Sequence, residues 1–111
     1  MQGPIIVRMI KVYVIYPNNS GGTFDMSYYL SNHMPMVKNK LGVALKGMTV
    51  DDGISGGQPG TDAPYRVIAT LLFDSVESFQ AAFGPVAGEI QGDIPKYTNI
   101  APTIQISEVK L

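Results

Sequence analysis

The sequence contains no cysteine, which excludes disulfide bonds, thiolate nucleophiles, zinc–thiolate sites and iron–sulfur clusters. Charged residues are also scarce, at 15% of the chain, whereas hydrophobic residues make up 45%. Because so little charge is available to keep a surface hydrated, we expect part of the apolar surface to be covered by a second copy of the chain in a homodimer.

The chain has no large excess of positive or negative charge. The net charge is −1 and the eight basic residues are scattered, so we predict no nucleic-acid partner, which would require clustered Lys and Arg. No apolar run approaches the ~18–20 residues that span a bilayer, so no membrane partner is predicted. The start, MQGPIIVRMIKVYVIYP, lacks the basic region and cleavage site of a signal peptide. We therefore expect a cytoplasmic protein.

The chain of 111 residues has the size of a single domain, and β-branched and aromatic runs predict four strands. These strands are expected at Met9–Tyr16, Val43–Val50, Tyr65–Phe73 and Thr103–Lys110. Residues Asp51–Pro64 are rich in Gly, Pro, Asp and Ser, which predicts a long hairpin loop.

A first helix is predicted after Asp25, whose carboxylate suits an N-cap, with Phe24 and Tyr29 as a hydrophobic staple. Pro35 is expected to kink or restart this helix, and Gly42 to end it. Spacings of three and four residues place one apolar face on Met26, Tyr29, Leu30, His33 and Val37.

A second helix is predicted after Asp74, which forms a capping-box pattern with Glu77. The pair Gly84-Pro85 should break or bend it. Its inner face is expected to carry Val76, Phe79, Phe83, Ala87 and Ile90.

The resulting order, strand–helix–strand–strand–helix–strand, predicts an α+β ferredoxin-like βαββαβ sandwich with both helices on one face of an antiparallel sheet. Ile10, Val12 and Val14 alternate with Tyr13 and Ile15 along the first strand. Because both sides of this strand carry apolar residues, we expect the second face of the sheet to pack against a second copy.

Several of these segments resemble the EthD family. The resemblance rests on "VIYP" at the end of the first strand, on "FDMSYYLSNHMPM", on "G…LKG" and on "FDSVESFQAAFGPVAGEIQGDIPKYTNIAPTIQISEV". It covers residues 9–111 as a single domain and leaves residues 1–8 as an N-terminal extension, so that translation from Met9 is conceivable. It implies a ferredoxin-like unit whose sheets pair in a homodimer, forming a dimeric α/β barrel.

The same resemblance implies a range of functions. The family is named after a protein encoded beside ether-degrading monooxygenase components, and fungal relatives are linked to the tailoring of aromatic polyketides, including decarboxylation. Related dimeric α/β barrels include lactone isomerases, cofactor-free monooxygenases and haem-degrading enzymes. In these proteins the ligand typically lies in a cavity between helices and sheet.

His33, the only histidine, is the candidate catalytic residue, because imidazole can act as an acid or a base near neutral pH. The resemblance implies that the matching histidine faces a pocket. The alternative is a helix histidine that is hydrogen-bonded to a carbonyl and only packs the helix on the sheet.

The candidate substrate-binding residues are Tyr28, Tyr29, Phe83, Asp93 and Tyr97. The phenols could orient a ligand oxygen, but Tyr29 could equally be a core residue and Tyr28 could meet a subunit interface. Asp93 and Tyr97 lie in an irregular stretch that could edge a site or form a simple turn. Aromatic residues at helical spacing, such as Phe83, are usually core.

No metal site or cofactor is predicted. The segment "GISGGQPG" lacks the Lys-Ser/Thr pair of a phosphate cradle, and a single histidine gives no metal-ligand cluster. Together with the resemblance, these residues lead us to expect a cofactor-free enzyme; the resemblance implies a hydrophobic aromatic or polyketide-like metabolite as its substrate and isomerisation, decarboxylation or degradation as its reaction. The alternative is an accessory protein that binds or carries such a metabolite without catalysis.

Overall fold

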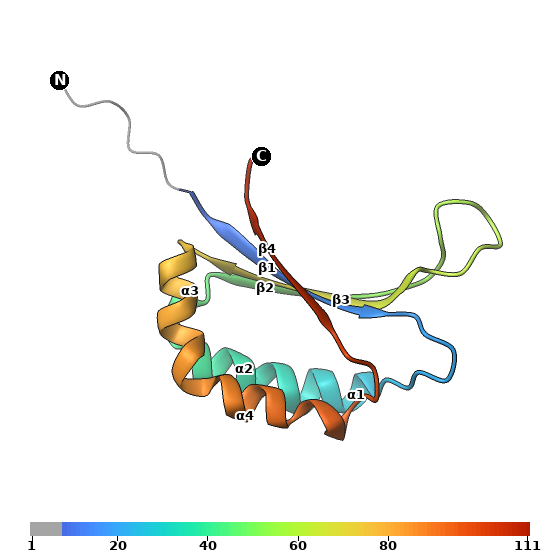
Figure 1. The fold of residues 1–111 in the computed structure, drawn as a ribbon, viewed down its shortest axis with the longest axis horizontal. Coiled ribbons are helices and arrows are strands. Elements are labelled where there is room, and N and C mark those ends of the chain that lie inside the picture. The colour runs from blue at the N-terminus through green and yellow to red at the C-terminus, as the bar shows by residue number, and fades with distance from the viewer. Residues whose placement is uncertain (1–7) are drawn as a thin grey trace.

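The computed structural model describes residues 8–111, and the predicted ferredoxin-like fold is confirmed (Figure 1). The extension before residue 9 lies almost wholly outside the described residues and stays a prediction. The elements run in the order β1 (Ile10–Pro17), α1 (Met26–Tyr28), α2 (Met34–Leu41), β2 (Gly47–Asp52), β3 (Tyr65–Phe73), α3 (Val76–Phe83), α4 (Ala87–Gly92) and β4 (Thr103–Glu108).

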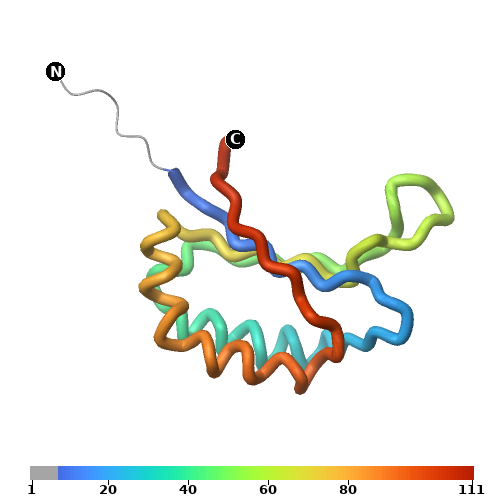
Figure 2. The backbone as a smooth tube through the Cα atoms, in the orientation of Figure 1, coloured from blue at the N-terminus to red at the C-terminus, as the bar shows by residue number. Residues whose placement is uncertain are grey.

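The four strands form one antiparallel sheet in the order β2-β3-β1-β4. Val12 of β1 pairs with Leu71 of β3 on one side and with Ile106 of β4 on the other. All helices lie on one face of this sheet (Figures 1 and 2). The buried strand residues on this face are Ile10, Val12, Tyr16, Val67, Ala69, Leu71 and Phe73.

The opposite face of the sheet is not covered by any helix of residues 8–111. It carries Tyr13, Ile15, Ile68 and Leu72, which alternate with the buried residues and are only partly buried. Ile15 and Ile68 are direct cross-strand partners. The expectation that β1 is apolar on both sides is therefore confirmed.

The start of the first helical segment is as the sequence predicts. The carboxylate of Asp25 accepts a hydrogen bond from the backbone N–H of Tyr28 at 3.0 Å, and the rings of Phe24 and Tyr29 lie 5.0 Å apart between centroids. Such a cap satisfies a backbone donor that has no partner within the helix. Gly42 ends the segment with a positive φ of 60°.

The predicted restart of the helix near Pro35 is confirmed, since α2 begins at Met34 with Pro35 in its first turn. The sequence did not predict the π-helical turn at Tyr29–His33 that precedes α2. The physical reason is that Pro35 has no N–H for the carbonyl four residues before it and would clash with it, and a wider turn removes this conflict. Leu30, predicted on the buried face, is 51% exposed, whereas Tyr29 and His33 of the same predicted face are buried.

Two further boundaries differ from the prediction. The second strand begins at Gly47 and not at Val43, because a separate 3₁₀ turn at Gly42–Ala44 follows the helix and leaves Val43 exposed. The N-cap of α3 is Ser75 and not Asp74, since the hydroxyl of Ser75 accepts from the N–H of Ser78 at 3.0 Å.

The break at Gly84-Pro85 and the long hairpin loop are confirmed. A 3₁₀ turn at Gly84–Val86 separates α3 from α4, which run in different directions (Figure 1). The loop that follows β2 projects away from the body of the domain (Figure 2). Its base is fixed by the side chain of Asn18, which donates to the carbonyl of Ala63 at 2.9 Å.

Ser75→Ala is expected to lower the free energy of unfolding by about 1 kcal/mol, because a lost N-cap hydrogen bond costs roughly 0.5–2 kcal/mol. Asp74→Ala is the matched control, since its exposed pair with Lys46 at 3.9 Å contributes less than about 0.5 kcal/mol. Urea unfolding followed by circular dichroism measures both. A larger loss in the Asp74 variant would contradict this assignment of the cap.

Candidate active site

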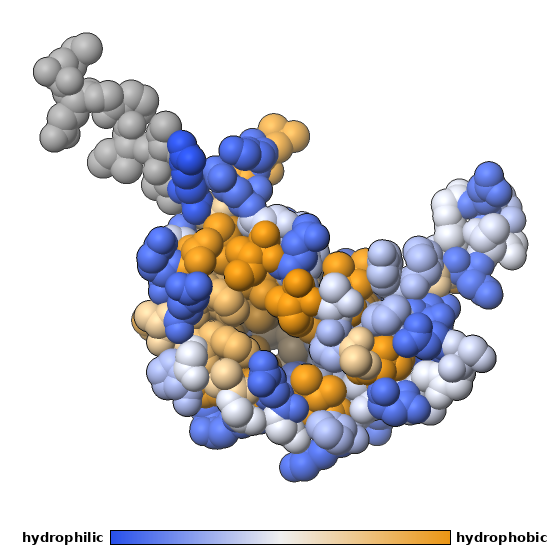
Figure 3. All heavy atoms as spheres, in the orientation of Figure 1, coloured by the Kyte–Doolittle hydropathy of each residue, from blue (hydrophilic) through white to orange (hydrophobic). Residues whose placement is uncertain are grey.

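A cavity of about 570 Å³ lies between the helices and the covered face of the sheet. Figure 3 shows the molecule hollowed between these layers, with hydrophobic residues around the hollow. Apart from five polar side chains, the lining is apolar, with Val12, Val14, Met34, Val37, Leu41, Ala69, Leu71, Phe79, Phe83, Ile90, Ile94, Pro102 and Ile104. The polar lining residues are Tyr16, Tyr29, His33, Gln91 and Tyr97.

The imidazole of His33 belongs to the wall of this cavity and is only 4% exposed. The π turn places it over Tyr29, with the two rings stacked at 5.4 Å between centroids. The ring of Tyr97, 64 positions later in the chain, also packs against the imidazole, with 4.6 Å between the ring centroids. The ring is therefore held by aromatic contacts on more than one side, and not by a backbone carbonyl.

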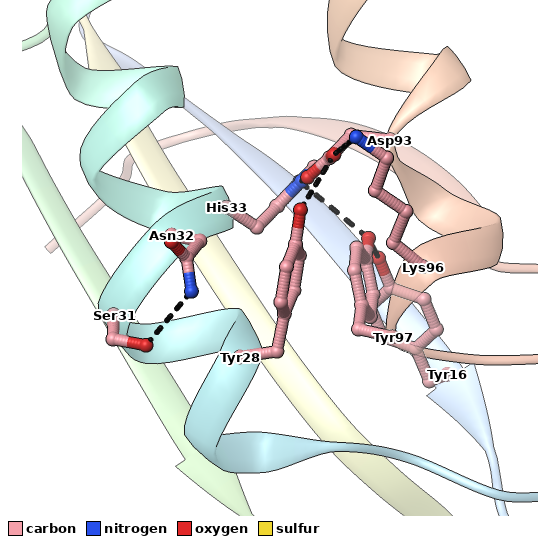
Figure 4. A network of polar contacts seen from close by, with 8 residues as sticks. All are labelled: Tyr16, Tyr28, Ser31, Asn32, His33, Asp93, Lys96 and Tyr97. Atoms are coloured by element: carbon pink, nitrogen blue, oxygen red, sulfur yellow. Dashed lines mark hydrogen bonds and ion pairs between the residues drawn. The ribbon is translucent and has the colours of Figure 1, made fainter.

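Asp93 fixes the orientation of the imidazole (Figure 4). Its Oδ2 lies 2.9 Å from Nδ1 of His33, and its Oδ1 accepts from the hydroxyl of Tyr28 at 2.9 Å. Lys96 lies 3.5 Å from the same Oδ1 with its ammonium largely in solvent. A carboxylate in this position requires a proton on Nδ1, so that Nε2 carries the free lone pair of the neutral ring.

On the Nε2 side of His33 lies a pair of phenols. The hydroxyl of Tyr97 is 3.5 Å from Nε2 and 2.6 Å from the hydroxyl of Tyr16. Tyr16 was not among the residues expected from the sequence, because a tyrosine near the end of a β-strand is indistinguishable from a core residue there. Its partner lies 81 positions away, so only the folded chain brings them together.

The electrostatics of the site follow from burial. Burial lowers the pKa of His33 below its usual 6.5, and the bond and charge of Asp93 only partly oppose this. Burial also acts to raise the pKa of Asp93, but the hydrogen bonds from His33 and Tyr28 and the charge of Lys96 outweigh it, so that the pKa falls. At neutral pH the site therefore holds a neutral imidazole beside an ionised carboxylate.

The phenols of the site are protonated in the same pH range. Burial raises the pKa of Tyr16, Tyr29 and Tyr97 well above the usual value. For Tyr28 the main cause of a raised pKa is the hydrogen bond to Asp93. Each of these hydroxyls is therefore a hydrogen-bond donor and not an anion.

The six residues predicted from the sequence fall into two groups. His33, Tyr29, Phe83 and Tyr97 line the cavity, whereas Tyr28 and Asp93 lie behind His33 and do not line it. Asp93 thus contacts the imidazole and is placed to position it. Within residues 8–111 there is no cluster of side chains that could hold a metal ion.

The arrangement as a whole is suited to proton transfer. A neutral imidazole in the cavity wall, with its free lone pair on the side of Tyr97, can accept a proton from a bound molecule, and the carboxylate of Asp93 can stabilise the imidazolium that forms. Apolar walls in general limit the access of water to a molecule bound between them.

The chain matches the EthD domain family over residues 23–101. The chain belongs to the EthD family. None of the functionally curated proteins matches it. No helix within residues 8–111 has the length and apolarity to cross a membrane.

Solved structures agree with this EthD assignment. An EthD-like protein from Ralstonia eutropha JMP134 is 44% identical, with 96% of each chain covered and a TM-score of 0.90. An ethyl tert-butyl ether D (EthD) family protein from Bacillus halodurans C-125 is 22% identical, with 92% of this chain and 99% of that chain covered and a TM-score of 0.64. A putative antibiotic biosynthesis monooxygenase from Bordetella bronchiseptica shares the fold at 13% identity, with 96% and 100% covered and a TM-score of 0.62.

The single imidazole makes the site directly measurable by NMR titration. We expect a pKa for His33 below 6.5, because burial disfavours the charged ring. Asp93→Asn should lower this pKa further, since it removes the carboxylate that favours imidazolium, whereas Lys96→Gln, at an exposed position, should change it little. An imidazole pKa above 6.5 in the unchanged protein would contradict the assigned environment.

Protein stability should also depend on this group. Because the pKa of His33 is lower in the folded chain, the unfolded chain takes up the proton first as the pH falls below 6.5. The free energy of unfolding should therefore decrease from pH 6.5 down to the folded-state pKa. Asp93, with a pKa below 3.8, adds a loss only near and below that pH. In His33→Gln the decrease of the unfolding free energy just below pH 6.5 should be smaller. Urea unfolding at several pH values measures this free energy for both proteins.

Proposed function

We propose that this EthD-family protein is a cofactor-free enzyme in which His33 transfers a proton to and from a hydrophobic metabolite bound in the cavity. The observation that carries the proposal is the imidazole itself. It is buried in the wall of an apolar cavity of about 570 Å³ and bonded at Nδ1 to Asp93 at 2.9 Å. A buried histidine with a purely structural role does not need a ligand-sized cavity on its other side.

The cavity has the properties of a small-molecule site. Its volume of about 570 Å³ lies within the ~300–1,000 Å³ usual for such sites, which are mostly apolar with a few polar groups. Here the polar groups gather around His33, Tyr97 and Tyr16. These features support an aromatic or polyketide-like carbon skeleton with an oxygen at one end.

The proposed reaction is the transfer of one proton at a carbon next to a carbonyl. Nε2 of His33 accepts the proton, the electron pair of the C–H bond forms an enolate, and Asp93 stabilises the imidazolium. Return of the proton to the same or another atom gives the starting compound or its isomer. These two proton transfers balance without any oxidant or reductant. Of the expected reactions, isomerisation is therefore the one that the site supports most directly.

The test uses 2-tetralone, a bicyclic ketone with acidic hydrogens beside its carbonyl. In D₂O near neutral pH, ¹H NMR follows replacement of these hydrogens by deuterium. The protein should accelerate the exchange, and His33→Gln should reduce the acceleration by ~10²–10⁴-fold, as expected for the loss of a general base. Asn32→Gln, at the exposed neighbouring position, is the control and should behave as the unchanged protein.

The alternative, an accessory protein that binds or carries a metabolite, predicts a different result. The ketone would then bind without any acceleration of exchange, and His33→Gln would leave its affinity nearly unchanged. Absence of binding would contradict both functions. The apolar walls favour neither alternative, whereas the imidazole fixed by Asp93 favours the enzyme, because a carrier needs no oriented base.

We also propose that two copies pair through the uncovered face of the sheet. Tyr13, Ile15, Ile68 and Leu72 lie on this face, and the low charge of the chain supports the same conclusion. A structural neighbour from Bacteroides fragilis, 10% identical with a TM-score of 0.55, is described as dimeric. Pairing through the sheet leaves the cavity on the helical side of each copy.

Ile68→Asp is expected to give a monomer, because a carboxylate in the centre of a dry interface has no partner and is costly to bury. Leu30→Asp is the matched control, since Leu30 is 51% exposed on the helical side of the molecule and its change should leave the dimer intact. Light scattering coupled to size-exclusion chromatography measures both masses. A dimer that survives Ile68→Asp would contradict pairing through this face.

A further inference from the structure

The two buried phenols beside His33 have a hydrogen-bond donor with no strong acceptor. Tyr16 and Tyr97 are 1% and 3% exposed, and one hydroxyl donates to the other at 2.6 Å. Two hydroxyls supply two protons, so one proton remains after this bond. The other acceptor near the hydroxyl of Tyr97 is Nε2 of His33, at 3.5 Å, which exceeds the usual ~2.7–3.2 Å. The hydroxyl of Tyr29 interacts with that of Tyr16 on the other side of the pair.

The direction of the bond between the phenols decides where this proton lies. If Tyr16 donates to Tyr97, the proton of Tyr97 points toward His33, and donation from Tyr16 strengthens Tyr97 as a donor. A ligand oxygen in the cavity beside the hydroxyl of Tyr97 would receive a better hydrogen bond than the long one to Nε2. The same position brings the atom next to that oxygen close to Nε2.

The charges around this position restrict the ligand. Among the cavity-lining residues of the described chain there is no Lys, Arg, Asp or Glu. Asp93 lies directly behind His33, so even a protonated imidazole would form a neutral pair with it and offer little net charge to a ligand. A carboxylate or phosphate in the cavity would be a buried charge without a counter-ion, and burying such a charge is strongly unfavourable.

We propose that the hydroxyls of Tyr16 and Tyr97 form a binding subsite for a single uncharged oxygen, a ketone carbonyl or a neutral phenol, and that the cavity rejects carboxylates. The hydroxyl of Tyr97 donates a hydrogen bond to the ligand oxygen. The hydroxyl of Tyr16 donates to that of Tyr97 and so strengthens Tyr97 as a donor. The inference deepens the proposed function, on which it rests, because it names the chemical class of ligand that reaches His33. It also disfavours an acid as the substrate.

The test uses four probes that share one carbon skeleton: naphthalene, 2-naphthol, 2-acetylnaphthalene and 2-naphthoate. Isothermal titration calorimetry near neutral pH gives the dissociation constant of each. We expect the phenol and the ketone to bind about 3–10-fold more tightly than naphthalene, the effect of one net hydrogen bond. The carboxylate should bind at least ~10-fold more weakly than the phenol, because its charge is unpaired.

Tyr97→Phe should remove the preference for the oxygen-bearing probes and leave the affinity for naphthalene unchanged. Tyr16→Phe should reduce the preference without abolishing it, since it removes only the supporting donor. Both changes keep the ring, so circular dichroism and thermal melting should show a folded protein. Tyr65→Phe is the control, because Tyr65 is 44% exposed and does not line the cavity.

The outcomes separate this inference from the proposed function. Equal affinity for all probes, tighter binding of the carboxylate, or a preference that survives Tyr97→Phe would overturn the oxygen subsite. His33-dependent exchange of 2-tetralone could still be observed in that case. Conversely, the oxygen preference could depend on both tyrosines while the protein does not accelerate hydrogen exchange of 2-tetralone. That result would support the subsite and contradict the proposed enzymatic function. Failure of every probe to bind would overturn both.

Discussion

The bond between His33 and Asp93 is the contact on which the site depends. A buried imidazole needs a partner for its N–H, and this partner comes from the segment that follows α4, 60 residues further along the chain. The bond therefore connects the two helical segments at one end of the cavity. It also selects the tautomer of the ring, so a single 2.9 Å contact links packing to acid–base chemistry.

Irregular helices make room for the cavity. The π turn at Tyr29–His33 carries the imidazole that lines the cavity, and the 3₁₀ turn at Gly84–Val86 bends the second helical segment away from a straight path. Two regular helices packed closely on the sheet would fill this space with side chains. Breaks in helices are frequent at functional sites, and here each break can be traced to a proline, Pro35 and Pro85.

The order of strands and helices along the chain and the alternation of side chains along β1 were predictable, because alternation and helical spacing are local properties of the sequence. Asp25 was correctly assigned as a cap for the same reason. Ser75 was missed because Asp74 and Ser75 are adjacent and both are good caps, so only the backbone geometry decides between them. The π turn was missed because Pro35 can end, kink or widen a helix.

The site was less predictable than the fold, for a reason that Tyr16 and Asp93 illustrate. Neither residue has a distinctive neighbour in the sequence, and their roles arise from contacts with Tyr97 and His33 that span 81 and 60 positions. A tyrosine at a strand end and an aspartate after a helix are ordinary in isolation. His33 could be selected as the sole imidazole, but whether it packs or reacts depends on what surrounds Nδ1 and Nε2. In the folded chain the carboxylate of Asp93 contacts Nδ1, while the hydroxyl of Tyr97 lies 3.5 Å from Nε2 in the wall of an apolar cavity, an arrangement that supports the proposed role as a base.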